Sequence, residues 1–392
     1  MPQTIVYVLS AFPVLSETFV TNEIRAMRAM GHTVVPVALA PYDGPCQPQD
    51  EAMRDEVIHL ADIPALEAMV LRPDRLAAAW RFIRTQRSFP SRALLLAGAR
   101  IALAVRRAGA NHIHAHFAHS AAATAITAAR LSGATVSFIG HGCDIYGDPV
   151  DVPAKLAAAD LVFATCTDMA ADFRAMVPGV NTLVTYCGID PECFAPRPGQ
   201  RNGRLLAIGR LVEQKGYPVL FQALAKLPYA RRPVVDVVGT GPLEAELAAL
   251  AEGLGVAGSV RFLGARASSW IAANGPDYLG LVAPYVICAN GDRDTARIVV
   301  KEALAMGLPV VASRLMGMKE MVMPDCGRLL PPGDATALAH AVDWLVTMEE
   351  PERAALAAAG RRHVEANFTL AAQAQAMTAA IEAIQERRAC AA

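Results

Sequence analysis

Two carboxylates eight positions apart, Asp294 and Glu302, are the residues of this sequence whose types and spacing first suggest chemistry. The segment between them predicts the start of a helix, which ends at Gly307 and Pro309. On an ideal helix the two residues would lie about 12 Å apart along the axis and about 80° apart around it. Two carboxylates that flank one scissile glycosidic bond need roughly 5 to 9.5 Å. The pattern therefore favours an elongated anionic ligand, with phosphates at the positive helix end and sugar hydroxyls on the carboxylates, although a capped helix with surface acids explains it equally well.

Two basic residues upstream, Arg210 and Lys215, fall in a loop between a predicted strand (205–209) and a predicted helix (217–227). In an open α/β sheet, ligands bind at the carboxyl ends of the strands, where this loop lies. The pair is thus placed to meet phosphates, whereas an isolated loop Arg or Lys is usually only solvated.

A glycine turn, Gly239-Thr240-Gly241-Pro242, follows the next predicted strand and precedes another helix. On its own this turn is weak evidence for a phosphate site, because tight strand-to-helix turns need glycine in any case. Near the N-terminus, a predicted strand (5–9) leads through FPVLSETF into a helix that runs to about Met30. The turn after that first strand reads SAFPVL and lacks GxGxxG, so a dinucleotide-dependent oxidoreductase is not expected.

Four histidines stand out in the N-terminal half. His112, His114 and His116 alternate with apolar residues, so a strand would place all three on one face. We expect no metal there, because no carboxylate or cysteine lies at ligand spacing in the sequence. His141 differs, since it ends a predicted apolar strand (136–139) at the edge where a pocket forms, and it is a candidate site residue.

Composition indicates a large protein of two or three domains. The chain has 392 residues, of which 54% are hydrophobic, and a net charge of −1, so nucleic acid is not an expected partner. Its eight cysteines are scattered without CxxC spacing, which is typical of reduced thiols. The sequence begins directly with a predicted strand and contains no window of 18 uncharged apolar residues, so we expect a cytoplasmic location.

One stretch, 71–110, is strongly basic. It contains nine arginines against the single acid Asp74, interleaved with Trp80, Phe82 and Phe89. A basic amphipathic stretch of this kind can lie peripherally on an anionic inner-membrane surface. Helices that simply present arginines to water explain the pattern somewhat better.

Composition also predicts the domain boundaries. The segment 191–204 is rich in proline and glycine and lacks an apolar run, which is typical of a linker. It separates an N-terminal domain (1–195) from a C-terminal domain (200–365), and the tail (366–392) continues as an alanine-rich helical pattern.

Taken together, these segments resemble family 4 retaining glycosyltransferases of the GT-B fold. In the C-terminal half the resemblance rests on GRLVEQKG (209–216), VVGTGPLEAEL (237–247), VRFLGA (260–265) and GDRDTARIVVKEALAMGLPVVAS (291–313). In the N-terminal half, FPVLSETFVTNEI, HIHAHFAHSAAATA and VSFIGHGCDIY resemble bacterial exopolysaccharide glycosyltransferases of the colanic-acid type. The resemblance implies an α/β fold of two doubly wound Rossmann-like domains that face a central cleft, with the last helix crossing back to the first domain.

The resemblance also implies a reaction, namely metal-independent transfer of a hexose from a UDP- or GDP-linked sugar, with retention, to a lipid-linked oligosaccharide or polysaccharide acceptor. No cofactor is implied beyond the nucleotide sugar. The expected catalytic residues are His141, Arg210, Lys215 and Glu302, and the expected donor-binding residues are Gly209, Gly239, Gly241, Asp294, Thr295, Ala296 and Arg297. The expected acceptor-side residues are Ser16, Glu17, His116 and Asp144, and residues 260–266 would lie near the base.

One departure from the family pattern leaves other functions open. The family normally has glutamate followed by a glycine-containing loop where this sequence reads Asp294-Thr295-Ala296-Arg297. A sugar-nucleotide epimerase of the same fold and a non-catalytic partner of a transferase are the alternatives. An epimerase would interconvert nucleotide sugars without an acceptor, whereas a non-catalytic partner would bind them or do nothing.

Overall fold

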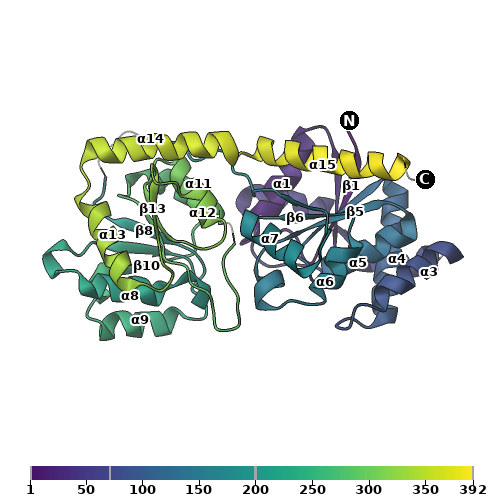
Figure 1. The fold of residues 1–392 in the computed structure, drawn as a ribbon, viewed down its shortest axis with the longest axis horizontal. Helices are drawn as coiled ribbons and strands as arrows, with labels where there is room; N and C mark the ends of the chain where they lie inside the picture. Colours follow the sequence, from purple (N-terminus) through teal and green to yellow (C-terminus); the bar gives the residue numbers. More distant parts are fainter. Residues whose placement is uncertain (1, 70–71, 198–200, 296, 391–392) are drawn as a thin grey trace. The chain divides into compact units, whose positions relative to one another are not determined.

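The chain folds into two compact units. The computed structural model describes residues 2–69, 72–197, 201–295 and 297–390. The first unit consists of Met1–Gly188 together with Leu370–Ala392, and the second of Ile189–Thr369. Each unit is a parallel sheet with helices packed on it (Figure 1). The predicted fold class, two doubly wound α/β halves, is confirmed.

The first unit is built on a seven-stranded parallel sheet with the order β3-β2-β1-β4-β5-β6-β7. Its strands are β1 (Thr4–Leu9), β2 (Thr33–Ala38), β3 (Ile58–His59), β4 (His112–His116), β5 (Thr135–Gly140), β6 (Leu161–Ala164) and β7 (Thr182–Val184). Its helices are α1 (Thr18–Ala29), α2 (Ala65–Ala68), α3 (Pro73–Ile83), α4 (Ser91–Ala108), α5 (Ser120–Ser132), α6 (Val152–Ala158), α7 (Thr167–Met176) and α15 (Leu370–Cys390). The central strands are buried, as a parallel sheet covered on both faces requires.

The last helix, α15, completes the core of the first unit. Met377, Ile381 and Ile384 are almost fully buried and pack in one cluster with Ile24 and Met27 of α1. Figure 1 shows α15, in yellow, lying beside α1. Segments about 350 residues apart in the sequence thus share one hydrophobic core, and its burial stabilises both.

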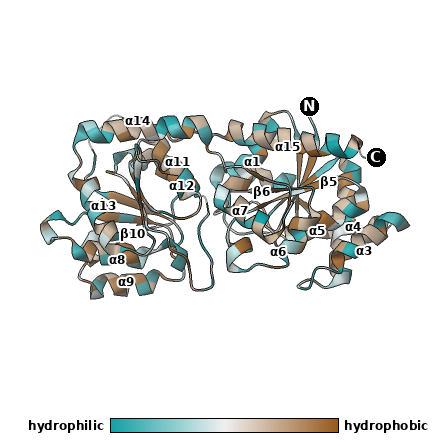
Figure 2. Cartoon of the chain, in the orientation of Figure 1, coloured by the Kyte–Doolittle hydropathy of each residue, from teal (hydrophilic) through white to brown (hydrophobic). Residues whose placement is uncertain are grey.

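The second unit is built on a six-stranded parallel sheet with the order β10-β9-β8-β11-β12-β13. Its strands are β8 (Leu205–Ile208), β9 (Val235–Val238), β10 (Val260–Gly264), β11 (Leu281–Ala283), β12 (Val310–Ser313) and β13 (Gly327–Leu330). Its helices are α8 (Tyr217–Lys226), α9 (Glu244–Gly253), α10 (Ser268–Asn274), α11 (Ile298–Ala305), α12 (Met318–Met321), α13 (Ala335–Thr347) and α14 (Glu350–Asn367). Figure 2 shows hydrophobic residues along strands such as β10, with hydrophilic residues on the outer helices.

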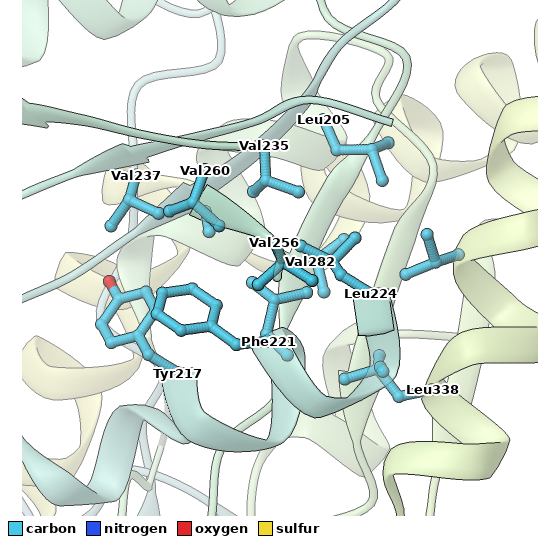
Figure 3. Packing of buried hydrophobic residues seen from close by; sticks show 14 of the residues in the cluster. Leu205, Tyr217, Phe221, Leu224, Val235, Val237, Val256, Val260, Val282 and Leu338 are labelled. Carbon is cyan, nitrogen blue, oxygen red and sulfur yellow. The ribbon is translucent and has the colours of Figure 1, made fainter. Parts of the chain in front are cut away.

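A continuous apolar core holds α8 against this sheet. Phe221 and Leu224 of α8 are fully buried and pack with Val235 and Val237 of β9 and with Val282 of β11 (Figure 3). This packing fixes the N-terminus of α8, and with it the loop after β8, at the carboxyl end of the sheet.

The boundary between the two units, at Ile189, lies slightly before the linker predicted at 191–204. Ile189 bridges to Thr369, and Arg361 of α14 donates hydrogen bonds to the carbonyls of Pro191 and Phe194. Residues 189–194 therefore belong to the second unit, because their backbone is bound there. The helix that contains Glu302 begins at Ile298, so Asp294 lies before it.

Candidate functional site

The loop after β8 presents two cations in different settings. Arg210 is exposed, whereas Lys215, on a short 3-10 turn, is buried with 4% of its surface accessible. The Lys215 Nζ lies 2.7 Å from Asp294 Oδ2 and 4.8 Å from the centre of the Tyr285 ring. Burial lowers the pKa of Lys215, and the positive charges of Arg297 and Arg210 lower it further.

Asp294 connects this loop to the segment before α11. Its carboxylate is almost fully buried, with Oδ2 on Lys215 and Oδ1 on the Arg297 guanidinium. The carbonyl of the buried Thr295 accepts a hydrogen bond from the Gly317 amide, and Ala296 lies outside the described residues. The structure thus brings together two residues from the predicted phosphate loop and the predicted donor segment, 79 positions apart.

Glu302 lies inside α11, one turn beyond the helix start. The helix begins at Ile298 after the N-cap Arg297, so Asp294 is outside it. The two carboxylates therefore lie on either side of the helix start, and the separation calculated for an ideal helix does not apply to them. Glu302 is buried, which raises the pKa of its carboxyl to about 7, although Lys301 acts in the opposite direction. Such a carboxyl changes its charge near neutral pH.

The glycine turn after β9 has a packing reason. A Cβ on Gly239 would lie 2.0 Å from the Gly209 carbonyl oxygen, and one on Gly241 would lie 2.5 Å from that of Leu211. Gly239 also has φ +141°, which other residues rarely adopt. Gly209 itself directly follows β8, and its carbonyl accepts a hydrogen bond from the Tyr217 hydroxyl. These glycines let the β8 and β9 loops approach closely.

In the first unit, aromatic rings surround His141. Its ring lies 4.3 Å from Phe19, 4.6 Å from Phe117 and, stacked at 9°, 5.2 Å from His116, between ring centres. His116 Nδ1 is 3.0 Å from His141 Nε2. Phe117 has φ +71°, a backbone conformation unusual for a bulky residue and often found at functional sites.

Asp144 holds the loop that contains His141 through hydrogen bonds to its backbone. It is fully buried, and its carboxylate accepts backbone hydrogen bonds from Ala118, His141 and Gly142. Burial raises the pKa of Asp144, and these three amides oppose the rise. Asp144 and His116 are both buried, and the acceptor-side role expected for them stays a prediction. Their burial follows from packing inside the unit.

Ser16 and Glu17 lie immediately before α1, beyond the carboxyl end of β1. Ser16 is exposed and Glu17 is half-buried, so both side chains are near the surface of the first unit. Their acceptor-side role stays a prediction.

Sequence reasoning missed Glu23, a fully buried acid of α1. Its carboxylate contacts Tyr7, His114, His116 and Gln373. The sequence places no carboxylate at ligand spacing from the histidines, but the fold brings one to them: the ligand atoms of Glu23, His114 and His116 lie within 4.8 Å of one another. A signal existed in the sequence, because Glu23 occupies the apolar stripe of α1.

Two family models match the chain. The model described as Glycosyltransferase Family 4 matches residues 16–193, and the model described as Glycosyl transferases group 1 matches residues 202–348. The first match falls mainly in the first unit and the second match within the second unit.

Several relatives are similar over nearly their whole length. The putative colanic acid biosynthesis glycosyltransferase WcaL of Escherichia coli (strain K12) is 28% identical, covering 92% of this chain and 95% of the relative. The amylovoran biosynthesis glycosyltransferase AmsK of Erwinia amylovora is 26% identical, covering 91% and 94%. Among solved structures, Anabaena Alr3699/HepE in complex with UDP has a TM-score of 0.75 at 18% identity, covering 97% and 100%. Sucrose-phosphate synthase from Thermosynechococcus elongatus has a TM-score of 0.74 at 20% identity and full coverage of both chains.

The close approach of the β8 and β9 loops predicts that Gly239→Ala destabilises the second unit. We expect a loss of at least about 2 kcal/mol in the free energy of unfolding, from the positive φ and from the contact with Gly209. Gly253→Ala, at the end of α9 with open space around it, is the control and should stabilise by up to about 1 kcal/mol. Urea unfolding measures both, and equal stabilities would contradict the packing role of Gly239.

Proposed function

We propose that this chain, which belongs to the family 4 glycosyltransferases and has the GT-B fold, transfers a hexosyl group from a nucleoside-diphosphate sugar, UDP- or GDP-linked, to a glycan or lipid-linked acceptor. The names of its relatives support a place in exopolysaccharide or cell-surface glycan synthesis. Solved structures of similar fold contain UDP or UDP-glucose, which supports a nucleotide-sugar donor. The observation that carries the proposal is the joining of Lys215, Asp294 and Arg297 beyond β8, at the edge where parallel sheets bind ligands.

The charges of this cluster suit a diphosphate leaving group. As the bond between the sugar and the diphosphate breaks, negative charge develops on the phosphate oxygens, and fixed cations at those oxygens lower the barrier. Arg210 and Lys215 supply this charge in our proposal, with Arg297 as a further phosphate contact. They take the part that a metal ion plays at other diphosphate sites, so donor chemistry proceeds without a divalent cation.

The two carboxylates serve different parts of the donor. Glu302 accepts hydrogen bonds from the ribose hydroxyls, and Asp294 accepts them from hydroxyls of the transferred sugar. Asp294 is one methylene shorter than the glutamate usual at this position, so its reach toward the sugar differs. The acceptor hydroxyl attacks from the face that the diphosphate leaves, with its proton passing to a departing phosphate oxygen, so the configuration is retained.

The first unit supplies the acceptor side. The rings of Phe19, Phe117 and His116 pack around His141, and we propose that His141 contacts the transferred sugar directly. Ser16 and Glu17, near the surface before α1, are the proposed acceptor contacts.

One observation favours a second candidate, a non-catalytic partner of a transferase. Asp294 is already bonded to both Lys215 and Arg297, and this pairing neutralises charge that a diphosphate would use. A sugar-nucleotide epimerase stays a third candidate, supported by the fold alone.

Donor binding tests the proposal directly. Thermal stability of the wild type is measured with UDP, GDP, ADP and their sugar conjugates, with and without added Mg²⁺. We expect one nucleotide family to raise the midpoint by several degrees, without need of Mg²⁺, because a ligand that binds only the folded state stabilises it. Lys215→Ala should abolish the shift, whereas Lys226→Ala, an exposed lysine of α8, should keep it.

Turnover then separates the candidates. Release of nucleoside diphosphate that depends on an acceptor supports the transferase, and interconversion of nucleotide sugars without an acceptor identifies an epimerase. A folded wild type that binds no nucleotide would point to the non-catalytic partner.

The pKa of Glu302, about 7, predicts pH-dependent donor binding. Only the ionised carboxylate accepts two ribose hydroxyls, so affinity should rise with pH and level off above pH 8, falling roughly ten-fold between pH 8 and pH 6. The ligand-free protein should show the opposite trend: the folded pKa is raised above 4.5, so stability is lost as pH rises from about 4.5 through 7. Calorimetric titration across this pH range measures the donor affinity, with Glu302→Gln as the control. A pH-independent affinity in the wild type would refute the proposed contact between Glu302 and the ribose.

The basic stretch of the first unit supports peripheral contact with an anionic membrane. Trp80 of α3 is 40% exposed, and the exposed arginines on or beside α3 and α4 are Arg72, Arg81, Arg84, Arg87, Arg92, Arg106 and Arg107. No helix of the described residues is long and apolar enough to cross a bilayer. Attraction between these arginines and anionic lipid heads would bring the enzyme to a lipid-linked acceptor.

Co-sedimentation with vesicles tests this contact. Binding to anionic vesicles at low salt should fall on adding salt and on replacing Arg81, Arg84 and Arg92 with glutamine, since each arginine near the surface contributes about 1 kcal/mol. Protein that stays wholly in the supernatant at low salt would exclude the contact.

A further inference from the structure

A polar cluster is buried in the first unit, whereas the proposed donor residues belong to the second unit. His114 and His116 project from β4, an internal strand, and Glu23 projects from α1. Their accessible surfaces are 0%, 1% and 1%. Such groups are costly inside a core unless each polar atom has a partner, so the bonding of each nitrogen is informative.

The hydrogen-bond directions between the side chains of β4 and β5 can be assigned one after another, starting from Thr135. The Thr135 hydroxyl donates to the Asn111 carbonyl, so its oxygen accepts from His112 Nδ1, at 2.8 Å. His112 Nε2 must then accept from the Ser137 hydroxyl, also at 2.8 Å. Ser137 has no second hydrogen to give, so its oxygen accepts from His114 Nδ1, again at 2.8 Å. A neutral His114 therefore has its lone pair on Nε2.

This lone pair faces another acceptor. His114 Nε2 lies 3.4 Å from Glu23 Oε1, is buried, and makes no hydrogen bond. His116 Nε2 lies 3.2 Å from the same oxygen, and the Tyr7 hydroxyl donates to it at 3.0 Å. Three groups converge on one carboxylate oxygen, and the space between two acceptors requires a positive charge.

We propose that Glu23, His114 and His116 bind one divalent transition-metal ion, with Zn²⁺ the best match. Imidazole nitrogens and a carboxylate are the ligands zinc prefers, and at its bond lengths of roughly 2.0–2.2 Å neighbouring tetrahedral ligands lie roughly 3.3–3.5 Å apart. The two measured separations from Glu23 Oε1, 3.2 and 3.4 Å, agree with this. All three ligand atoms lie within 4.8 Å of one another.

The atoms that face away from the site are bonded as a metal site needs. His114 Nδ1 is bonded to Ser137, and Glu23 Oε2 accepts from Gln373 Nε2 at 2.8 Å. His116 Nδ1 is 3.0 Å from His141 Nε2. Ligands of protein-bound metals are oriented by such outer contacts, which also fix the tautomer of each imidazole.

The ion would act on His141 through His116. With the metal on His116 Nε2, the ring hydrogen is on Nδ1 and is donated to His141 Nε2. Without the metal, His116 Nε2–H is donated to Glu23, and His116 Nδ1 instead accepts from His141. The metal thus selects which nitrogen of His141 bears hydrogen, while donor chemistry itself needs no metal.

Metal content of the full chain tests the proposal independently of activity. Protein made without a polyhistidine tag is analysed by inductively coupled plasma mass spectrometry. We expect about one zinc per wild-type chain, and less than about a tenth of that in His114→Gln and Glu23→Gln, because loss of one of three ligands removes most of the affinity. His119→Gln, a histidine of the same segment that bonds instead to the Asp148 carbonyl, should keep its zinc.

Cobalt provides a second measurement that needs no variant to fold. Wild-type protein grown with Co²⁺ should show the visible absorption of a low-coordinate nitrogen and oxygen site, and Zn²⁺ should remove it. A folded wild type with neither zinc nor a cobalt spectrum would overturn the proposal and assign the positive charge to a proton on His114.

Discussion

In a parallel sheet that is covered on both faces, polar side chains on the strands are buried and need hydrogen-bond partners, and this constraint determines where polar residues lie in both units. The central strands are buried and, apart from the histidines of β4 and Asp236 of β9, mostly apolar, so charged side chains collect in the loops at their carboxyl ends. In the second unit, Lys215 after β8 and Asp294 before α11 meet there. In the first unit, the same edge holds His141 after β5, supported by Asp144 beneath it. The position of each candidate residue follows from the direction of its strand.

The local sequence pattern predicted much of this architecture. Features that depend on contacts between residues far apart in the sequence were not predicted. Apolar runs predicted β1, β5 and β8, and alternation along β4 correctly placed three histidines on one face. Glu23 was missed because its partners lie 91 and 93 positions away, and only the packing of α1 and β4 reveals them. The pairing of Asp294 with Lys215 was also not predicted, because the two residues lie 79 positions apart in the sequence.

Two cations of the proposed donor site, Lys215 and Arg297, are already paired with Asp294 when no ligand is bound. Asp294 holds Lys215 and Arg297 by charge-assisted bonds in a buried setting, where an unpaired charge would be strongly unfavourable. In the proposed function, an incoming diphosphate would replace Asp294 as the partner of these cations, and the freed carboxylate would need hydrogen bonds of its own. Sugar hydroxyls would supply them, which would couple recognition of the phosphate to recognition of the sugar.

The discontinuity of the first unit bears on how the protein is made. Gln373 of α15 closes the hydrogen bonding of Glu23, and Met377 and Ile381 fill the core beside α1. A ribosome adds residues in order, so every residue of the second unit is joined to the chain before these side chains exist. The unit that begins the chain is therefore the one whose core is completed last, when α15 has been made.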